Sequence, residues 1–157
     1  MLKVTEVAAW VGAVAGPCAL LWDFYKWKTA GPRLKLTVSP NMQMIPDPDP
    51  DALYIMATVQ NQGTAGTTIT GMCFATYRSW WTRIRLKPST QFLVVTPSTT
   101  RPVPFKIEVG TEWLGMAIQD KELEQMIGAG NLWCNVYHSW SKRPVQAHVI
   151  QNRLRPK

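Results

Sequence analysis

Two histidines and three cysteines are the first residues of this 157-residue chain to consider for catalysis or metal binding. His138 and His148 lie in segments that we predict as strands. Ser139 follows His138 directly, but neighbouring strand residues point to opposite faces, so these two cannot form a nucleophile–base pair. Cys134 shares a strand face with His138 but lies four residues away, too far for direct contact. We predict no catalytic residues and a protein that is not an enzyme.

The cysteines Cys18, Cys73 and Cys134 form neither a CxxC pair nor a Cys/His cluster at metal-ligand spacing. Cys73 and Cys134 fall on predicted strands, where a disulfide across a sandwich is one possibility. No Trp follows Cys73 at the spacing of such a disulfide core, so we favour two buried free thiols in a reducing compartment.

Three carboxylates alternate with prolines over residues 46–51, at Asp47, Asp49 and Asp51. Calcium prefers oxygen ligands, which makes this segment a candidate metal site. The prolines favour an extended backbone that holds the carboxylates apart, and no glycine lets the loop wrap around an ion. We predict a stiff, solvated loop, no metal site and no cofactor.

Aromatic and basic residues gather in two segments, residues 77–87 and 138–143. Such a surface suits single-stranded nucleic acid, because cations neutralise phosphates and aromatic rings stack on bases. It suits an anionic membrane surface equally well, with Trp at the headgroups beside Lys and Arg. A third possibility is that a Trp of the first segment anchors the core and the charges only solubilise the domain. The candidate anionic-partner surface comprises Arg78, Trp80, Trp81, Arg83, Arg85, Lys87, Trp140, Lys142 and Arg143.

The formal net charge of +7 is unevenly distributed along the chain. Residues 52–106 and 125–157 carry only basic charges. Such a field favours acidic lipid, nucleic acid or an acidic protein face, although a basic surface without a dedicated ligand would look the same.

Residues 7–22 contain no charged side chain. As a helix this stretch would be about 24 Å long, a little short of the ~30 Å hydrocarbon core of a bilayer. An aromatic and basic collar lengthens it with residues that suit a membrane interface. The collar comprises Trp22, Phe24, Tyr25, Lys26, Trp27 and Lys28. We therefore predict a single-pass membrane anchor in residues 1–30.

Other interpretations of this segment remain open. A helix buried in the core or against a partner is one, although Pro17 argues against a soluble helix. A cleavable signal peptide would need a more basic start, and an interfacial helix would need a polar face. The cations just after the apolar run outnumber Lys3 before it, so the positive-inside rule places the following domain in the cytoplasm.

From residue 33 onward the hydrophobic pattern has a period of two, which indicates half-buried strands. Between residues 120 and 127 the pattern instead predicts a short helix, with Asp120 as N-cap and Gly128 in the left-handed conformation after its end. Several strands with one crossover helix between two sheets indicate an antiparallel β-sandwich over residues 31–157. The predicted strands are 33–39, 53–60, 67–79, 91–96, 103–109, 132–140 and 145–151.

The pattern Val59-x-Asn61-x-Gly63, followed by Thr67-Thr68-Ile69, is similar to a hairpin of bacterial immunoglobulin-like modules, such as the cell-adhesion-related and fibronectin-like repeats. The layout also resembles small, uncharacterised bacterial or phage proteins with one N-terminal membrane helix, a Gly-Pro junction and a single sandwich. These resemblances imply a mainly β, immunoglobulin-like antiparallel β-sandwich preceded by one apolar helix. Adhesion modules usually face the outside of the cell, whereas the charge bias here points inward.

These observations lead us to expect a non-enzymatic, membrane-anchored interaction module that presents a basic β-sandwich in the cytoplasm. Its partner would be the lipid surface, another protein or a second copy of the chain. Two alternatives stay open: a phage or virion assembly protein whose apolar helix is buried between subunits, and a nucleic-acid-binding module. We see no sign of a small-molecule substrate.

Overall fold

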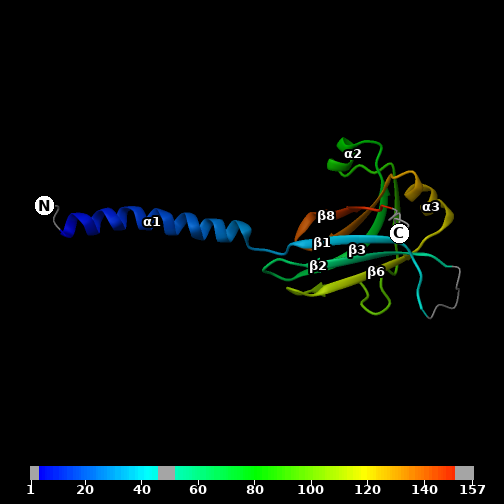
Figure 1. Cartoon of the computed structure of the whole chain (residues 1–157), viewed down its shortest axis with the longest axis horizontal. Coiled ribbons are helices and arrows are strands. Elements are labelled where there is room, and N and C mark those ends of the chain that lie inside the picture. Colours follow the sequence, from blue (N-terminus) through cyan, green and yellow to red (C-terminus); the bar gives the residue numbers. More distant parts are fainter. Residues whose placement is uncertain (1–3, 46–51, 151–157) are drawn as a thin grey trace, which may run out of the picture. The chain divides into compact units, whose positions relative to one another are not determined.

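A computed structural model describes residues 4–45 and 52–150 (Figure 1). The chain forms two compact units, Met1–Gly31 and Pro32–Lys157. Among the described residues, the first contains a single helix and the second contains two β-sheets and two short helices. The acidic Asp47, Asp49 and Asp51 lie outside the described residues, as do the last seven residues of the chain.

Helix α1 runs over Val4–Thr29, 26 residues with Pro17 inside. Its apolar side chains are spread around the helix, and those described from residue 13 to residue 26 are exposed to solvent. None of them belongs to the hydrophobic core. Within the part of the chain that the structure describes, no helix combines the length and the apolar character that a membrane crossing needs. This finding gives the predicted membrane span no support.

The second unit confirms the prediction of a mainly β fold with two antiparallel sheets. One sheet has three strands in the order β1-β2-β6, namely β1 (Leu34–Met42), β2 (Tyr54–Asn61) and β6 (Glu112–Ile118). The other sheet has the order β4-β3-β7-β8, with β5 also paired to β3. Its strands are β3 (Thr67–Thr76), β4 (Thr90–Val94), β5 (Phe105–Ile107), β7 (Leu132–His138) and β8 (Ser141–His148).

Two elements are absent from the sequence-based prediction. Strand β3 ends at Thr76 instead of continuing to residue 79, and helix α2 (Trp80–Ile84) follows it. The prediction of a single internal helix was therefore wrong. Strand β6 was missed because its inward positions include the small Gly115, while Leu114 and Ile118 point outward and are exposed, so polarity does not alternate.

Helix α3 (Lys121–Gly128) confirms the predicted crossover, because it connects β6 of one sheet to β7 of the other. Asp120 caps it, with its carboxylate oxygen accepting a hydrogen bond from the backbone N–H of Leu123 at 2.8 Å. Leu123 and Ile127 are buried on one face, as the spacing predicts. The prediction for Gly128 was wrong: it lies in the helix, and Gly130 adopts the left-handed conformation with φ of 69°.

The core lies between the two sheets and is built from inward-facing residues of both. Trp113 is its largest member, fully buried, with its indole N–H donating to the carbonyl of Arg101 at 2.9 Å. The ring of Trp113 extends over Gly115, where a Cβ atom would come within 2.5 Å of the indole. The small residue in the middle of β6 therefore makes room for the large one.

Cys73 and Cys134 are both buried and free, in agreement with the prediction. They lie on the adjacent strands β3 and β7, where Cys73 is paired with Asn135 and Cys134 with Phe74. Because directly paired residues share a face, the two thiols point to opposite faces of one sheet. The disulfide across the sandwich that the sequence left possible is therefore excluded, because both cysteines belong to one sheet and their thiols point to opposite faces.

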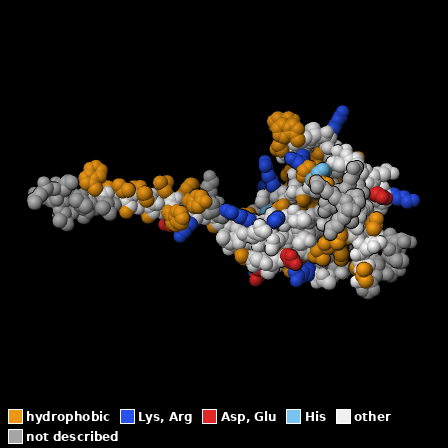
Figure 2. Space-filling model, viewed as in Figure 1, with side chains coloured by type: hydrophobic (Ala, Val, Ile, Leu, Met, Phe, Trp, Pro, Cys, Tyr) orange, Lys and Arg blue, Asp and Glu red, His pale blue; other side chains and the backbone are white. Residues whose placement is uncertain are grey.

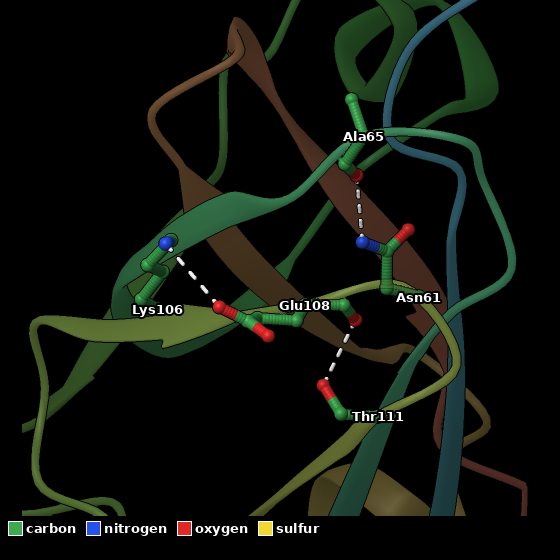
Figure 3. Close-up of polar contacts among 5 residues, drawn as sticks. All are labelled: Asn61, Ala65, Lys106, Glu108 and Thr111. Carbon is green, nitrogen blue, oxygen red and sulfur yellow. Dashed lines mark hydrogen bonds and ion pairs between the residues drawn. The ribbon is translucent and has the colours of Figure 1, made fainter.

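Asn61 has a structural role in the Val59-x-Asn61-x-Gly63 segment, and Figure 3 shows its contact with Ala65. Its buried amide donates to the carbonyl of Ala65 at 2.8 Å, and its side-chain oxygen accepts from the backbone N–H of Gly63 at 3.1 Å. The backbone of Asn61 also accepts from Gly110 and donates to Thr111. One side chain and its backbone thus hold the β2–β3 and β5–β6 loops together at one end of the sandwich.

Candidate interaction surfaces

The register of the strands divides the predicted anionic-partner surface between two ends of the sandwich. Ile69 pairs with His138, next to the β7–β8 turn, whereas Thr76 pairs with Leu132, at the start of β7. Residues 78–87 follow β3 at the second of these ends, and residues 140–143 lie at the first. We call the first the entry end, because β1 begins there, and the second the far end.

The entry end carries Trp140, Lys142 and Arg143 around the β7–β8 turn, all exposed. Ser139 fixes this turn, since its hydroxyl accepts from the backbone N–H of Thr68 and its own N–H donates to the carbonyl of Thr68. The entry end is also where the chain arrives from α1, through residues 30–33.

The far end carries helix α2, whose start is fixed by a capping box. The hydroxyl of Ser79 accepts from the backbone N–H of Thr82, and the hydroxyl of Thr82 accepts from the backbone N–H of Ser79. Trp80 and Trp81 stack on each other with ring centroids 4.1 Å apart, and each is more than half exposed. The possibility that one of them anchors the core is excluded. Figure 2 shows apolar and basic side chains together where Figure 1 places α2.

Arg83 and Trp133 meet at the far end although they are fifty residues apart in the sequence. The guanidinium of Arg83 lies 4.1 Å from the centre of the Trp133 ring, which in turn stacks on His148 at 4.7 Å. His148 is held by a 2.7 Å hydrogen bond between its Nε2 and the carbonyl of Gly130. This cation–π contact therefore restrains the position of the Arg83 guanidinium.

A small cleft of about 260 Å³ lies beside this stack. It is lined by Arg78, Ser79, Trp80 and Arg83 from one segment and by Asn131 and Trp133 from another, with Tyr77 between them. The Tyr77 hydroxyl accepts hydrogen bonds from the side-chain amides of Asn135 at 2.9 Å and Gln146 at 3.0 Å. These bonds hold Tyr77 in its place in the cleft lining. Arg85 and Lys87 are exposed beyond it.

Three residues of this end, Tyr77, Trp133 and His148, are absent from the candidate surface predicted from the sequence. Tyr77 is the first residue of the aromatic and basic segment 77–87, but the predicted candidate surface begins at Arg78. Trp133 and His148 reach Arg83 through the pairing of β7 with β3 and β8, and no local signal reveals that pairing.

The predicted collar lies in the last turns of α1. Trp22 and Tyr25 stack with ring centroids 6.1 Å apart, and the ammonium group of Lys26 lies 5.6 Å from the Trp22 ring. These contacts have the i, i+3 and i, i+4 spacing of one helix face. Phe24 is exposed, and the side chains of Trp27 and Lys28 lie outside what the structure describes.

The histidines and thiols form no reactive group among the described residues. The ring Nδ1 of His138 is buried without a hydrogen-bond partner there, and burial lowers the pKa of this histidine. Burial, with a smaller effect of the neighbouring Cys73, raises the pKa of Cys134 and keeps it a thiol. No cluster of His, Cys, Asp or Glu that could hold a metal ion occurs in residues 4–45 and 52–150.

A larger hollow of about 490 Å³ opens between the edge strands β4 and β6. Phe92, Val94 and Ala117 line it and also pack against the core. Leu93 and Val95 also line it and are exposed. It is the open side of the sandwich, and its lining has little charge.

Comparison with known proteins gives no match. No family model fits the chain, and no curated protein and no solved structure is detectably similar to it.

Proposed function

We propose that this protein is a non-enzymatic interaction module that α1 tethers to a membrane. The observation that carries the proposal is the uncovered apolar surface of α1. Trp10, Leu20 and Leu21 are each about 70% exposed, and the core of the second unit contains none of the described α1 residues. Each apolar Å² left in water costs about 25 cal/mol, so such a helix requires another apolar medium.

The composition of α1 favours lipid as that medium. Its apolar side chains surround the helix, whereas a helix that packs on one partner usually has a single apolar face. Trp22 and Tyr25 stack near its C-terminal end with Lys26 beside them, and aromatic rings with snorkelling cations suit the headgroup region.

We propose an immunoglobulin-like arrangement for the sandwich. The order β1-β2-β6 corresponds to strands A, B and E of that fold, and the order β4-β3-β7-β8 to strands C′, C, F and G. This fold hosts many functions, so it supports the proposal of a binding domain without naming a partner.

The cytoplasmic face of a membrane is the side that fits the proposal best. Cations follow the apolar run of α1, and the leaflet that faces the cytoplasm is anionic. Along the chain only residues 30–33 separate the entry end from α1, so an anionic leaflet would be within reach of the exposed Trp140, Lys142 and Arg143. Free, buried Cys73 and Cys134 suit a reducing compartment.

Cys18 is a natural reporter for this proposal. It is exposed on α1, whereas Cys73 and Cys134 are buried and should not react in the folded protein. With the chain reconstituted into vesicles of phosphatidylcholine and phosphatidylserine, we expect Cys18 to be protected from a water-soluble maleimide. Lys26→Cys, in a Cys18→Ser background, should be labelled because the collar lies at the headgroups.

The same vesicle experiment can contradict the membrane tether. If the protein does not float with the vesicles and Cys18 is labelled as fast as Lys26→Cys, the membrane tether is wrong. Defined oligomers without detergent, with Cys18 protected in them, would instead support an assembly protein whose helix is buried between subunits.

A further inference from the structure

The far end of the sandwich is separated from the end that receives the chain. The length of strand β7, from Leu132 to His138, lies between the α2 region and the β7–β8 turn. At about 3.3 Å per residue, this distance is roughly 20 Å. In the proposed function, the entry end follows the membrane tether in the chain, and the far end is available to bind a different partner.

The guanidinium of Arg83 is held in place by Trp133 but has no ion-pair partner among the described residues. Its central carbon lies 4.1 Å from the centre of the Trp133 ring, and among the described residues no carboxylate or carbonyl accepts a hydrogen bond from it. A guanidinium stacked on a ring keeps its N–H donors at its edge, in the arrangement that matches a carboxylate. Arg78 lines the same cleft, likewise without an ion pair in the described part of the chain.

An apolar anchor lies beside this cationic site. Trp80 and Trp81 form one stacked, exposed unit, and the capping box of Ser79 and Thr82 fixes the helix that carries them. The surface thus combines exposed Arg78, Trp80 and Trp81 with half-buried Tyr77 and Arg83. Trp, Tyr and Arg are the residue types that dominate the binding energy of protein–protein interfaces.

We propose that this far-end surface, formed by Tyr77, Arg78, Trp80, Trp81, Arg83 and Trp133, binds an acidic segment of a partner protein. A carboxylate of the partner would bind the edge of Arg83, and an apolar side chain beside it would pack on the tryptophan pair. Charge complementarity identifies this partner, because residues 52–106 carry no acidic side chain. The acidic Glu122 and Glu124 belong to α3, at the same end of the sandwich but outside the cleft lining.

The geometry favours a protein segment over single-stranded nucleic acid. A base that entered the cleft would need a free ring face there, but Trp133 already contacts Arg83 and stacks on His148. Trp80 and Trp81 stack on each other and keep only their outer faces for a partner. The cleft volume of about 260 Å³ is below the ~300–1,000 Å³ of typical ligand sites and matches one inserted side chain.

The test uses the full-length protein in nanodiscs of zwitterionic phosphatidylcholine, so that no anionic lipid competes. The first probe is a fluorescent, capped peptide of five Glu–Leu repeats. The second is hexathymidylate, whose five phosphodiesters match the charge of the peptide. Fluorescence anisotropy should show that the peptide binds and that Arg83→Ala weakens its binding at least about tenfold.

Two further variants make the test specific. Arg83→Lys should also weaken binding, because an ammonium group lacks the planar fork of donors. Arg143→Ala removes the same charge at the entry end and should change affinity by less than about twofold. Since α2 buries no side chain, these variants should unfold like the wild type, which urea denaturation checks.

Three results would overturn the inference: no binding of the peptide, equal losses for Arg83→Ala and Arg143→Ala, or tighter binding of hexathymidylate than of the peptide. The inference rests on the proposed function, but the two fail separately. A chain that leaves the nanodiscs contradicts the membrane tether, whereas a chain that stays in them without binding the peptide contradicts only the acidic partner.

Discussion

At the scale of single residues, Gly115 is the described glycine at which a side chain would have the least space, because the ring of Trp113 lies over it. Both lie on β6, and a Cβ atom at position 115 would meet the indole at 2.5 Å and the sulfur of Met72 at 3.1 Å. The indole is buried and tied to the carbonyl of Arg101, so it has little freedom to move away.

We therefore expect Gly115→Ala to lower the free energy of unfolding by about 1–3 kcal/mol, the usual cost of overpacking a core. Gly71→Ala is the matched control, because a Cβ atom there meets nothing within 4 Å. That substitution should change the free energy by less than about 1 kcal/mol. Urea denaturation followed by Trp fluorescence measures both, and equal effects would contradict the packing described here.

At the scale of elements, the two short helices of the second unit differ in what they bury. Helix α3 places Leu123 and Ile127 in the core, whereas α2 buries no side chain. The N-caps Asp120 and Ser79 make the same kind of hydrogen bond, but only the first supports core packing.

Asp120→Ala should consequently lower the global free energy of unfolding by about 1 kcal/mol, the typical value of an N-cap. Ser79→Ala should leave it unchanged within about 0.5 kcal/mol and increase amide hydrogen exchange only in α2. If Ser79→Ala destabilised the whole domain as much as Asp120→Ala, then α2 would be part of the cooperative core.

At the scale of the whole molecule, the hydrophobic core lies within the sandwich unit, and the described residues of α1 contribute nothing to it. All members of the buried core cluster lie between Ile55 and Val149. Their packing does not depend on α1, so the second unit has what it needs to fold independently.

A variant that begins at Gly31 should therefore unfold in one cooperative transition with the same urea midpoint as the full-length chain in detergent. The measurement follows the tryptophan fluorescence and the near-ultraviolet circular dichroism of each protein. A lower midpoint or a loss of cooperativity would show that α1 stabilises the sandwich.

The sequence by itself determined the features that depend on neighbouring residues. Alternating side chains predict β1, β2 and β7 to within a few residues, because a half-buried strand needs an apolar residue at every second position. Asp120 and the spacing of Leu123 and Ile127 predict α3 for an equally local reason.

Only the tertiary structure decided the features that depend on pairing between distant segments. Strand β6 has no alternating pattern, because the ring of Trp113 takes the space that larger residues at its inward positions would need. The register of β3 and β7 splits one predicted basic surface into an entry end and a far end, and it brings Trp133 under Arg83. Sequence patterns report which face of a strand is buried, whereas register fixes which residues of other strands lie beside it, and that fixes the surface a partner meets.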